Sequence, residues 1–213
     1  MSRVRRKAGT KEALLALSPP LVVNPKANRG NWQGFFNNNN KIHIELGMGR
    51  GTFIFTLAQR NPDINFIGLE IKEEVLITGI KKTLDYSLPN LAYVWGDVND
   101  LSDYFANEEV ARIYINFCDP WPKFRHTKRR ITHGNFLDIY QIILQERGEI
   151  HFKTDNEDLF EFSLNMFRAK NWGLKDVSLD FYRDLPLDNV PTEYELKFVE
   201  QGLKIFRLAA INI

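Results

Sequence analysis

The sequence is poor in cysteine, because Cys118 is the only one among its 213 residues. A single thiol excludes an internal disulfide and any zinc site built from several cysteines. Long apolar runs are also missing, and the first residues lack the apolar core of a signal peptide. We therefore expect a cytoplasmic protein that does not enter a membrane and that needs no metal.

A net excess of one charge is missing as well. The chain has 28 Lys and Arg residues against 27 Asp and Glu residues, for a net charge of +1. Lys and Arg residues are nevertheless concentrated in residues 3–11 and 123–130. Segregated charge on a nearly neutral protein predicts a local site for a polyanion. We interpret residues 3–11 as a basic arm, disordered by itself and able to touch RNA.

The first 40 residues have no sustained hydrophobic period. Pro19, Pro20 and Pro25 interrupt them, and Trp32 suggests a segment laid onto the domain. From residue 41 onward, apolar runs of strand length alternate with segments of helical period. We therefore divide the chain into a covering segment, 1–40, and a single domain, 41–213. Strands are predicted over residues 41–46, 64–69, 91–95, 110–117, 149–153, 174–181 and 204–210, and helices over 52–60, 72–86, 101–105, 132–145, 158–170 and from 193.

The strands are too apolar for a sheet with one solvated face. Their alternation with helices predicts an α/β fold, in which a doubly wound, mostly parallel sheet is covered on both faces. Ligands of such sheets bind beyond the carboxyl ends of the strands. Acids and glycines stand at the predicted strand ends, namely Glu45, Gly47, Gly49, Glu70, Asp97 and Asp119.

The glycines follow the first strand of the domain. Gly47, Gly49 and Gly51 would let a ligand approach the backbone closely, although a plain tight turn explains them too. A dinucleotide site is a rival, since Glu70 lies where its ribose-binding acid should. Its pattern, G-x-G-x-x-G, differs here because the third glycine comes one position early.

The acids decide between the two cofactors. Carboxylates crowded at the strand ends would repel a pyrophosphate. S-adenosylmethionine carries a sulfonium, an ammonium and no phosphate, so the acids favour this methyl donor over NAD. We expect Glu70 at the ribose hydroxyls, Asp97 near the adenine and Glu45 near the methionine end.

A stiff loop follows the strand that ends at residue 117. Pro120 and Pro122 fix the backbone around Asp119 and Trp121. Five of the next eight residues, 123–130, are Lys or Arg. Guanidinium groups beside an aromatic side chain suit phosphate contact and base stacking. A solvated surface loop is the alternative, but such a loop does not need a rigid acid and an indole.

These motifs together resemble those of the bacterial tRNA (guanine-N7)-methyltransferases, over nearly the whole chain. The matching stretches are Ile44-Glu45-Leu46-Gly47-Met48-Gly49, Ile67-Gly68-Leu69-Glu70, Asp119-Pro120-Trp121-Pro122-Lys123, Arg125-His126-Thr127-Lys128-Arg129-Arg130, His151-Phe152-Lys153-Thr154-Asp155-Asn156 and Thr192-Glu193-Tyr194-Glu195. The resemblance implies a Rossmann-like class I methyltransferase fold, with seven strands of which the last is antiparallel. It also implies S-adenosylmethionine-dependent methylation of the variable-loop guanine at tRNA position 46.

The resemblance assigns roles to matching positions. Asp119 is implied as catalytic, and it joins Glu45, Gly47, Gly49, Glu70 and Asp97 as donor-site positions. The guanine-site positions are Lys123, Asp155, Thr192, Glu193, Tyr194 and Glu195. The RNA-contact positions are Arg125, His126, Thr127, Lys128, Arg129 and Arg130. We expect tRNA as partner, and a monomer or a homodimer.

Several of these residues have simpler interpretations. The spacing of Thr192 and Glu195 is that of a helix capping box, which is compatible with guanine binding. Cys118 is more typical of packing than of a nucleophile, and guanine N7 already has a lone pair. His126 and His151 are better explained as a phosphate contact and a strand residue than as metal ligands. The rival functions are methylation of an exocyclic base amine and RNA binding without catalysis.

Overall fold

The computed structural model describes residues 9–183 and 189–213. Most of the basic arm therefore lies outside the described residues. The described residues contain an eight-stranded sheet in the order β1-β4-β3-β2-β5-β6-β8-β7. The strands are β1 (Leu21–Val22), β2 (Lys41–Leu46), β3 (Ile64–Glu70), β4 (Leu91–Trp95), β5 (Val110–Asn116), β6 (Leu144–Thr154), β7 (Gly173–Ser178) and β8 (Phe206–Ile211).

The last strand, β8, is antiparallel to both of its neighbours, β6 and β7. The pairs among β1 to β6 are all parallel. This confirms the predicted doubly wound sheet with an antiparallel last strand. The structure adds an eighth strand, β1, which pairs with Tyr93 and Val94 of β4. Two residues between prolines are too short to show a strand period, so the sequence did not indicate it.

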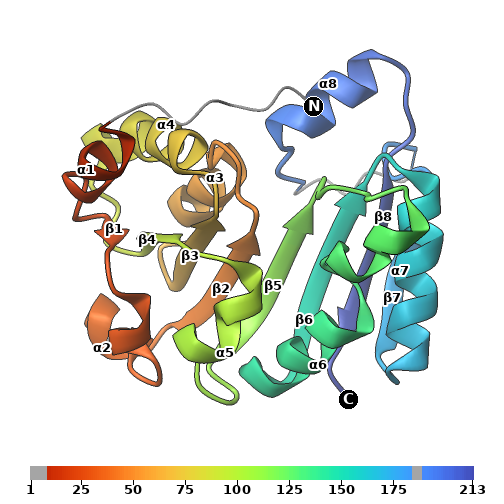
Figure 1. The fold of residues 1–213 in the computed structure, drawn as a ribbon, viewed down its shortest axis with the longest axis horizontal. Coiled ribbons are helices and arrows are strands. Elements are labelled where there is room, and N and C mark those ends of the chain that lie inside the picture. Colours follow the sequence, from red (N-terminus) through yellow and green to blue (C-terminus); the bar gives the residue numbers. More distant parts are fainter. Residues whose placement is uncertain (1–8, 184–188) are drawn as a thin grey trace.

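Helices cover both faces of the sheet (Figure 1). One hydrophobic cluster joins the sheet to α2 (Trp32–Phe36), α5 (Leu101–Tyr104), α6 (Gly134–Ile143) and α7 (Glu157–Ala169). A second cluster joins the other face to α1 (Thr10–Leu15), α3 (Thr52–Arg60) and α4 (Glu73–Thr83). Strands β2 and β3 are buried on both faces, as their continuous apolar runs predict.

The remaining helix, α8 (Glu193–Glu200), lies beyond the carboxyl ends of β5 and β6 (Figure 1). Its N-terminus follows the loop that returns from β7. This position places α8 over the edge at which a doubly wound sheet binds its ligands.

Residues 9–40 contribute one strand to the sheet and several side chains to its core. Trp32 is fully buried, stacks on Phe105 with ring centroids 5.5 Å apart, and donates its indole N–H to the Tyr104 carbonyl at 2.8 Å. The Glu109 carboxylate accepts from the backbone N–H of Trp32 at 3.0 Å. The division of the chain at residue 40 stays a prediction, but Trp32 belongs to the hydrophobic core and β1 to the sheet.

Three predicted boundaries differ from the observed ones by three residues or more. The helix expected to reach residue 86 ends at Thr83 and continues as a 3₁₀ turn, Leu84–Tyr86, closed by Ser87 at φ 44°. Strand β6 starts at Leu144, directly after α6, instead of at residue 149. Strand β7 ends at Ser178 and not at residue 181. Pairing with neighbouring strands, which local periodicity does not encode, sets the ends of β6 and β7.

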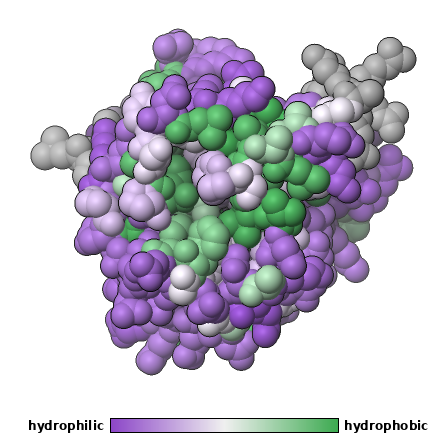
Figure 2. All heavy atoms as spheres, turned by 90° about the vertical axis from the view of Figure 1, so that its left-hand side faces the viewer, coloured by the Kyte–Doolittle hydropathy of each residue, from purple (hydrophilic) through white to green (hydrophobic). Residues whose placement is uncertain are grey.

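The side of the molecule on which α1, β1 and α4 lie carries a hydrophobic surface (Figure 2). Exposed apolar side chains of the first 40 residues include Leu15, Val23 and Phe35. Among the described residues, no helix is both long and apolar enough to cross a membrane.

Candidate functional site

The turn after β2 is shaped by its glycines. Gly47, Gly49 and Gly51 have φ values of 71°, 58° and 72°, in the left-handed region that favours glycine. Around Gly47 and Gly49 a Cβ would meet open space, so the backbone conformation, and not crowding, requires glycine there. Gly51 is the N-cap of α3.

Glu70, at the end of β3, braces this turn. Its Oε2 accepts the Gly49 N–H at 3.1 Å, and its Oε1 accepts from the backbone of Ile71 and Lys72 at 3.0 and 2.9 Å. The side chain is buried. The acid and the glycines that the sequence placed at two strand ends are therefore in direct contact.

Glu45 is buried at the end of β2 beside the glycine turn. Its Oε1 accepts a hydrogen bond from the Asn116 amide at 3.0 Å, and its Oε2 has no hydrogen-bond partner among the described residues. Burial raises the pKa of Glu45 to about 8, against the opposing effect of the Asn116 hydrogen bond. The carboxyl group therefore holds a proton at neutral pH, although the sequence suggested an anion.

Asp97 follows β4 and caps the 3₁₀ turn Val98–Asp100. Its Oδ1 accepts from the backbone and the side-chain amide of Asn99, at 2.9 and 2.7 Å. Its side chain is partly exposed, at the same edge of the sheet as Glu70.

Asp119 and Asp155 follow the adjacent strands β5 and β6. Neither carboxylate has a hydrogen bond or ion pair within the described residues, and both are partly exposed. The strand ends are joined because the Phe117 N–H donates to the Lys153 carbonyl at 2.9 Å. Two unpaired carboxylates thus stand beyond neighbouring strands.

Cys118 lies between this edge and the first hydrophobic cluster. Burial, followed by the nearby Asp119 charge, raises the pKa of its thiol to about 12. A neutral thiol is a poor nucleophile, which favours the packing interpretation of Cys118.

The basic loop forms a 3₁₀ helix, Phe124–Arg129. Lys123, Arg125, Lys128 and Arg129 are exposed, and the Phe124 side chain is 94% exposed. The Arg129 guanidinium also lies 5.0 Å from the centre of the Trp121 ring. The loop thus presents charges and aromatic surface to solvent.

Arg130 differs from its neighbours because it is turned inward. Its Nε donates to the Pro120 carbonyl at 2.9 Å, and its guanidinium lies 4.5 Å from the centre of the Phe162 ring. Trp121 has a φ of 44°, an uncommon value for a non-glycine residue. Arg130 therefore fixes the Asp-Pro-Trp-Pro turn, in addition to the RNA contact that was expected of it.

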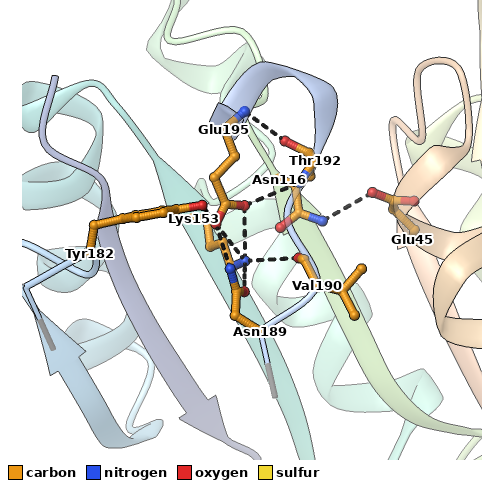
Figure 3. A network of polar contacts seen from close by, with 8 residues as sticks. All are labelled: Glu45, Asn116, Lys153, Tyr182, Asn189, Val190, Thr192 and Glu195. Carbon is orange, nitrogen blue, oxygen red and sulfur yellow. Dashed lines mark hydrogen bonds and ion pairs between the residues drawn. The ribbon is translucent and has the colours of Figure 1, made fainter. Parts of the chain in front are cut away.

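A buried polar network holds the first turn of α8 against β6 (Figure 3). Glu195 is fully buried and forms the predicted capping box with Thr192. Its Oε1 accepts from Lys153, Tyr182 and Asn189 at 3.2, 3.1 and 3.1 Å, and its Oε2 accepts from Lys153 at 3.0 Å and from the Thr192 N–H at 3.3 Å. These donors use the lone pairs of Glu195.

The first two residues of α8, Glu193 and Tyr194, line the same cleft as the glycine turn. Glu193 accepts from the Thr52 hydroxyl at 2.8 Å and from Lys82 at 2.7 Å, so it ties α8 to α3 and α4. The Lys82 hydrogen bond is the main cause that lowers the pKa of Glu193. Tyr194 is 59% exposed and stacks on Phe198.

These elements enclose one cleft. Its lining combines the glycine turn, Glu45, Asn116 and Phe117 with Thr192, Glu193 and Tyr194 of α8. Of the predicted site residues, the cleft brings together those of β2 and α8. Glu70 and Asp97 lie along the sheet edge on one side of it, and Asp119, Asp155 and the basic loop on the other.

Sequence reasoning missed Asn116, Lys153 and Asn189 as members of this site. A signal existed for Lys153, since a lysine inside an apolar strand must find a partner when it is buried. No local pattern pointed to Asn189, which is 36 residues from the lysine that it contacts.

The histidines are not arranged for metal binding. Burial lowers the pKa values of His43, to about 3, and of His151. His151 Nε2 lies 2.7 Å from Oε2 of Glu149, two residues earlier on β6. His151 is thus a strand residue with a hydrogen-bond partner on its own strand. In the described part of the chain, no three His, Cys, Asp or Glu side chains gather as a metal site.

The chain is similar to known proteins along nearly its whole length. The family described as putative methyltransferase matches residues 39–208. The tRNA (guanine-N(7)-)-methyltransferase of Clostridioides difficile (strain 630) is 52% identical over 209 residues, which cover 98% of each chain. A protein of the same name from Brevibacillus brevis is 48% identical, over 98% of this chain and 97% of its own.

Solved structures share the fold at low identity. The 16S rRNA methyltransferase KamB matches with a TM-score of 0.65 at 13% identity, over 85% of this chain and 92% of its own. A precorrin-6y C5,15-methyltransferase from Geobacter metallireducens matches with a TM-score of 0.56 at 12% identity, over 81% and 82%. These likenesses confirm the predicted class I methyltransferase fold.

Proposed function

The chain belongs to the family of bacterial tRNA (guanine-N7)-methyltransferases, and we propose that it methylates guanine N7 in tRNA with S-adenosylmethionine as donor. We further propose the variable-loop guanine at position 46 as the target. The cytoplasmic location and the monomeric or homodimeric state stay predictions of the sequence.

The cleft fits this donor. When bound, S-adenosylmethionine supplies a methyl group activated by its sulfonium. The unpartnered Oε2 of buried Glu45 offers an acceptor to a ligand ammonium, which would also favour the ionised carboxylate. Glu70 would hold the ribose hydroxyls and Asp97 would lie near the adenine. The positive φ values of Gly47 and Gly49 favour glycine, and because glycine has no side chain the donor could approach the backbone of the turn closely.

The target guanine would enter between the donor cleft and the basic loop. Guanine N7 has a lone pair, so the reaction needs no base to activate it. The purine gains positive charge as the methyl group arrives, and a fixed carboxylate stabilises that charge. Asp119 is unpaired and held by the Asp-Pro-Trp-Pro turn, which supports it as the group that orients the guanine and offsets its charge.

Asp155 is the best candidate to accept the N–H donors of the guanine edge. Glu195 is less suited because four protein donor groups already occupy its carboxylate with five hydrogen bonds. We therefore propose that Glu195 shapes the guanine site from behind. Thr192, Glu193, Tyr194 and Lys123 would border it.

The basic loop would hold the RNA backbone. Arg125, Lys128 and Arg129 are exposed for phosphate contact, with His126 and Thr127 beside them, while Arg130 holds the turn. Phe124, almost fully exposed, adds a surface on which a base can stack. The tRNA backbone would thus be held while the target base leaves its tertiary contacts.

The pair of unpaired carboxylates beside a glycine-turn cleft carries this proposal. Its test is nucleoside analysis of unmodified tRNA after incubation with the protein and labelled donor. We expect 7-methylguanosine, and a transcript with adenosine at position 46 should accept no label. Label on an exocyclic amine would establish the rival methylase activity, and tRNA binding in a filter assay without any label would favour an RNA-binding protein without catalysis.

A further inference from the structure

A second cavity lies on the face of the sheet that α3 covers, and the proposed reaction does not use it. It has a volume of about 300 Å³. His43, Tyr114 and His151 line it from β2, β5 and β6. They alternate along these strands with residues of the first hydrophobic cluster, so they point to the opposite face. Residues of α3 and of the segment before α8 form the walls.

The lining of this cavity is strongly basic. Its described residues include Arg60, Arg112, Lys153 and Arg207 but no Asp or Glu. The whole chain has a net charge of only +1, so four cations without a carboxylate are a local concentration. A concave surface lined by one sign of charge attracts the opposite ion.

Two of these cations are partly neutralised. Lys153 pairs with Glu195, and the terminal nitrogen of Arg112 donates to Glu149 at 2.9 Å. Arg112 Nε is nevertheless buried without an acceptor among the described residues. A buried donor without a partner is costly, which favours a ligand that brings an acceptor.

The other two cations are available. Arg60, in the last turn of α3, has no ion pair within the described residues. Arg207 approaches Asp176 only to 3.9 Å and lies 5.2 Å from the centre of the Phe181 ring. Guanidinium groups from α3, β5 and β8 thus line one cavity, and their planar forks suit the oxygens of a phosphate.

The cavity is too large and too aromatic for a phosphate alone. Phe53, Phe66, Tyr114 and Phe181 line it together with the two imidazoles. Its volume is at the lower end of the range for small-molecule sites. Because burial lowers the pKa values of His43 and His151, both rings are neutral and able to hydrogen-bond a base.

We propose that this cavity is a second binding site, which takes a phosphate-bearing nucleotide. The guanidinium groups of Arg60, Arg112 and Arg207 hold the phosphate, and the aromatic wall holds the base. The nucleotide comes either from the tRNA itself or from the free nucleotide pool. The site is distinct from the donor cleft, and among the described lining residues the two share only Phe53 and Asn116.

The test uses uridine 5′-monophosphate, which carries the phosphate but does not mimic guanine. Calorimetry on the full chain should detect binding, and the Arg60→Gln/Arg207→Gln variant should weaken it about tenfold or more. The matched control is Arg168→Gln, an exposed residue of α7 on the other face of the sheet, and this variant should bind like the wild type. Thermal unfolding and donor affinity of both variants should equal those of the wild type.

Competition identifies the source of the nucleotide. If the tRNA occupies the cavity, uridine 5′-monophosphate should raise the KM for tRNA, and so should the double variant. If a free nucleotide occupies it, the mononucleotide binds without competing. Absence of binding, or binding of inorganic phosphate and the mononucleotide unchanged in the double variant, would overturn the proposal. The methylation assay is separate, so this site can fail without the proposed activity failing.

Discussion

The Lys153 ammonium lies 3.0 Å from Oε2 of Glu195, and both side chains are buried. This ion pair connects the end of β6 to the first turn of α8, and thereby fixes the residues of α8 that line the cleft. Desolvation lowers the pKa of Lys153, while the charge of Glu195 opposes that change. The pair is thus a contact that is costly to break from one side.

We predict that Lys153→Met destabilises the protein by about 3–5 kcal/mol, because it leaves the buried Glu195 charge unpaired. Adding Glu195→Gln removes that charge and should recover much of the loss. Urea unfolding measures both. The control is Lys82→Met, which breaks the exposed pair with Glu193 and should cost less than about 1 kcal/mol. Equal stability of the single and double variants would show that the pair does not hold α8.

Asp119→Asn should lower kcat by about a hundredfold, as expected when one electrostatic contact to the transition state is removed. The substitution keeps the shape of the side chain, so donor affinity should change little. The comparison variant is Cys118→Ala, which removes a partly buried thiol whose pKa is raised to about 12. A larger loss of activity in Cys118→Ala than in Asp119→Asn would show that Asp119 is the wrong residue for this role.

The exposed basic side chains of the loop should determine how the affinity for tRNA depends on salt concentration. Replacing Arg125 and Lys128 with Gln should reduce the slope of log affinity against log salt by roughly 0.7–0.9 for each lost phosphate contact. Arg130→Gln should instead lower kcat, because Arg130 braces the Pro120 carbonyl. Filter binding at several salt concentrations separates the two effects. An unchanged slope and affinity would mean that the loop is only a solvated surface.

Glu45 predicts a pH dependence of stability. The folded chain keeps the Glu45 proton up to a pKa of about 8, whereas the unfolded chain loses it near 4.5. Its contribution is complete below pH 4.5 and is lost as pH rises toward 8, with a slope of up to about 1.4 kcal/mol per pH unit. Glu45→Gln should remove this component from urea unfolding curves taken between pH 5 and pH 8, a window chosen from that pKa shift.

The same group predicts a proton change on donor binding. A ligand ammonium near Oε2 would favour the ionised carboxylate, so binding at pH 7 should release up to about one proton. Calorimetry in buffers of different ionisation enthalpy measures that number. Glu45→Gln should bind with no release from this position, and equal release in both proteins would contradict the assignment.

The sequence by itself determined the features that depend on neighbours along the chain. The continuous apolar runs of β2 and β3 predicted strands buried on both faces, and the spacing of Thr192 and Glu195 predicted the capping box. The glycines after β2 predicted the turn whose backbone only glycine adopts easily. These features follow from local periodicity, backbone sterics and hydrogen bonds within a few residues.

Only the tertiary structure decided which distant groups meet. Lys153 and Glu195 are 42 residues apart, and Lys82 and Glu193 are 111 apart. Neither pair has a local signal, because a side chain's partner depends on how the strands and helices pack. The same holds for the two-residue β1, which is a strand because β4 offers it an edge. Burial, which packing alone creates, also keeps a proton on Glu45. Packing likewise leaves Asp119 and Asp155 without a hydrogen bond or ion pair among the described residues.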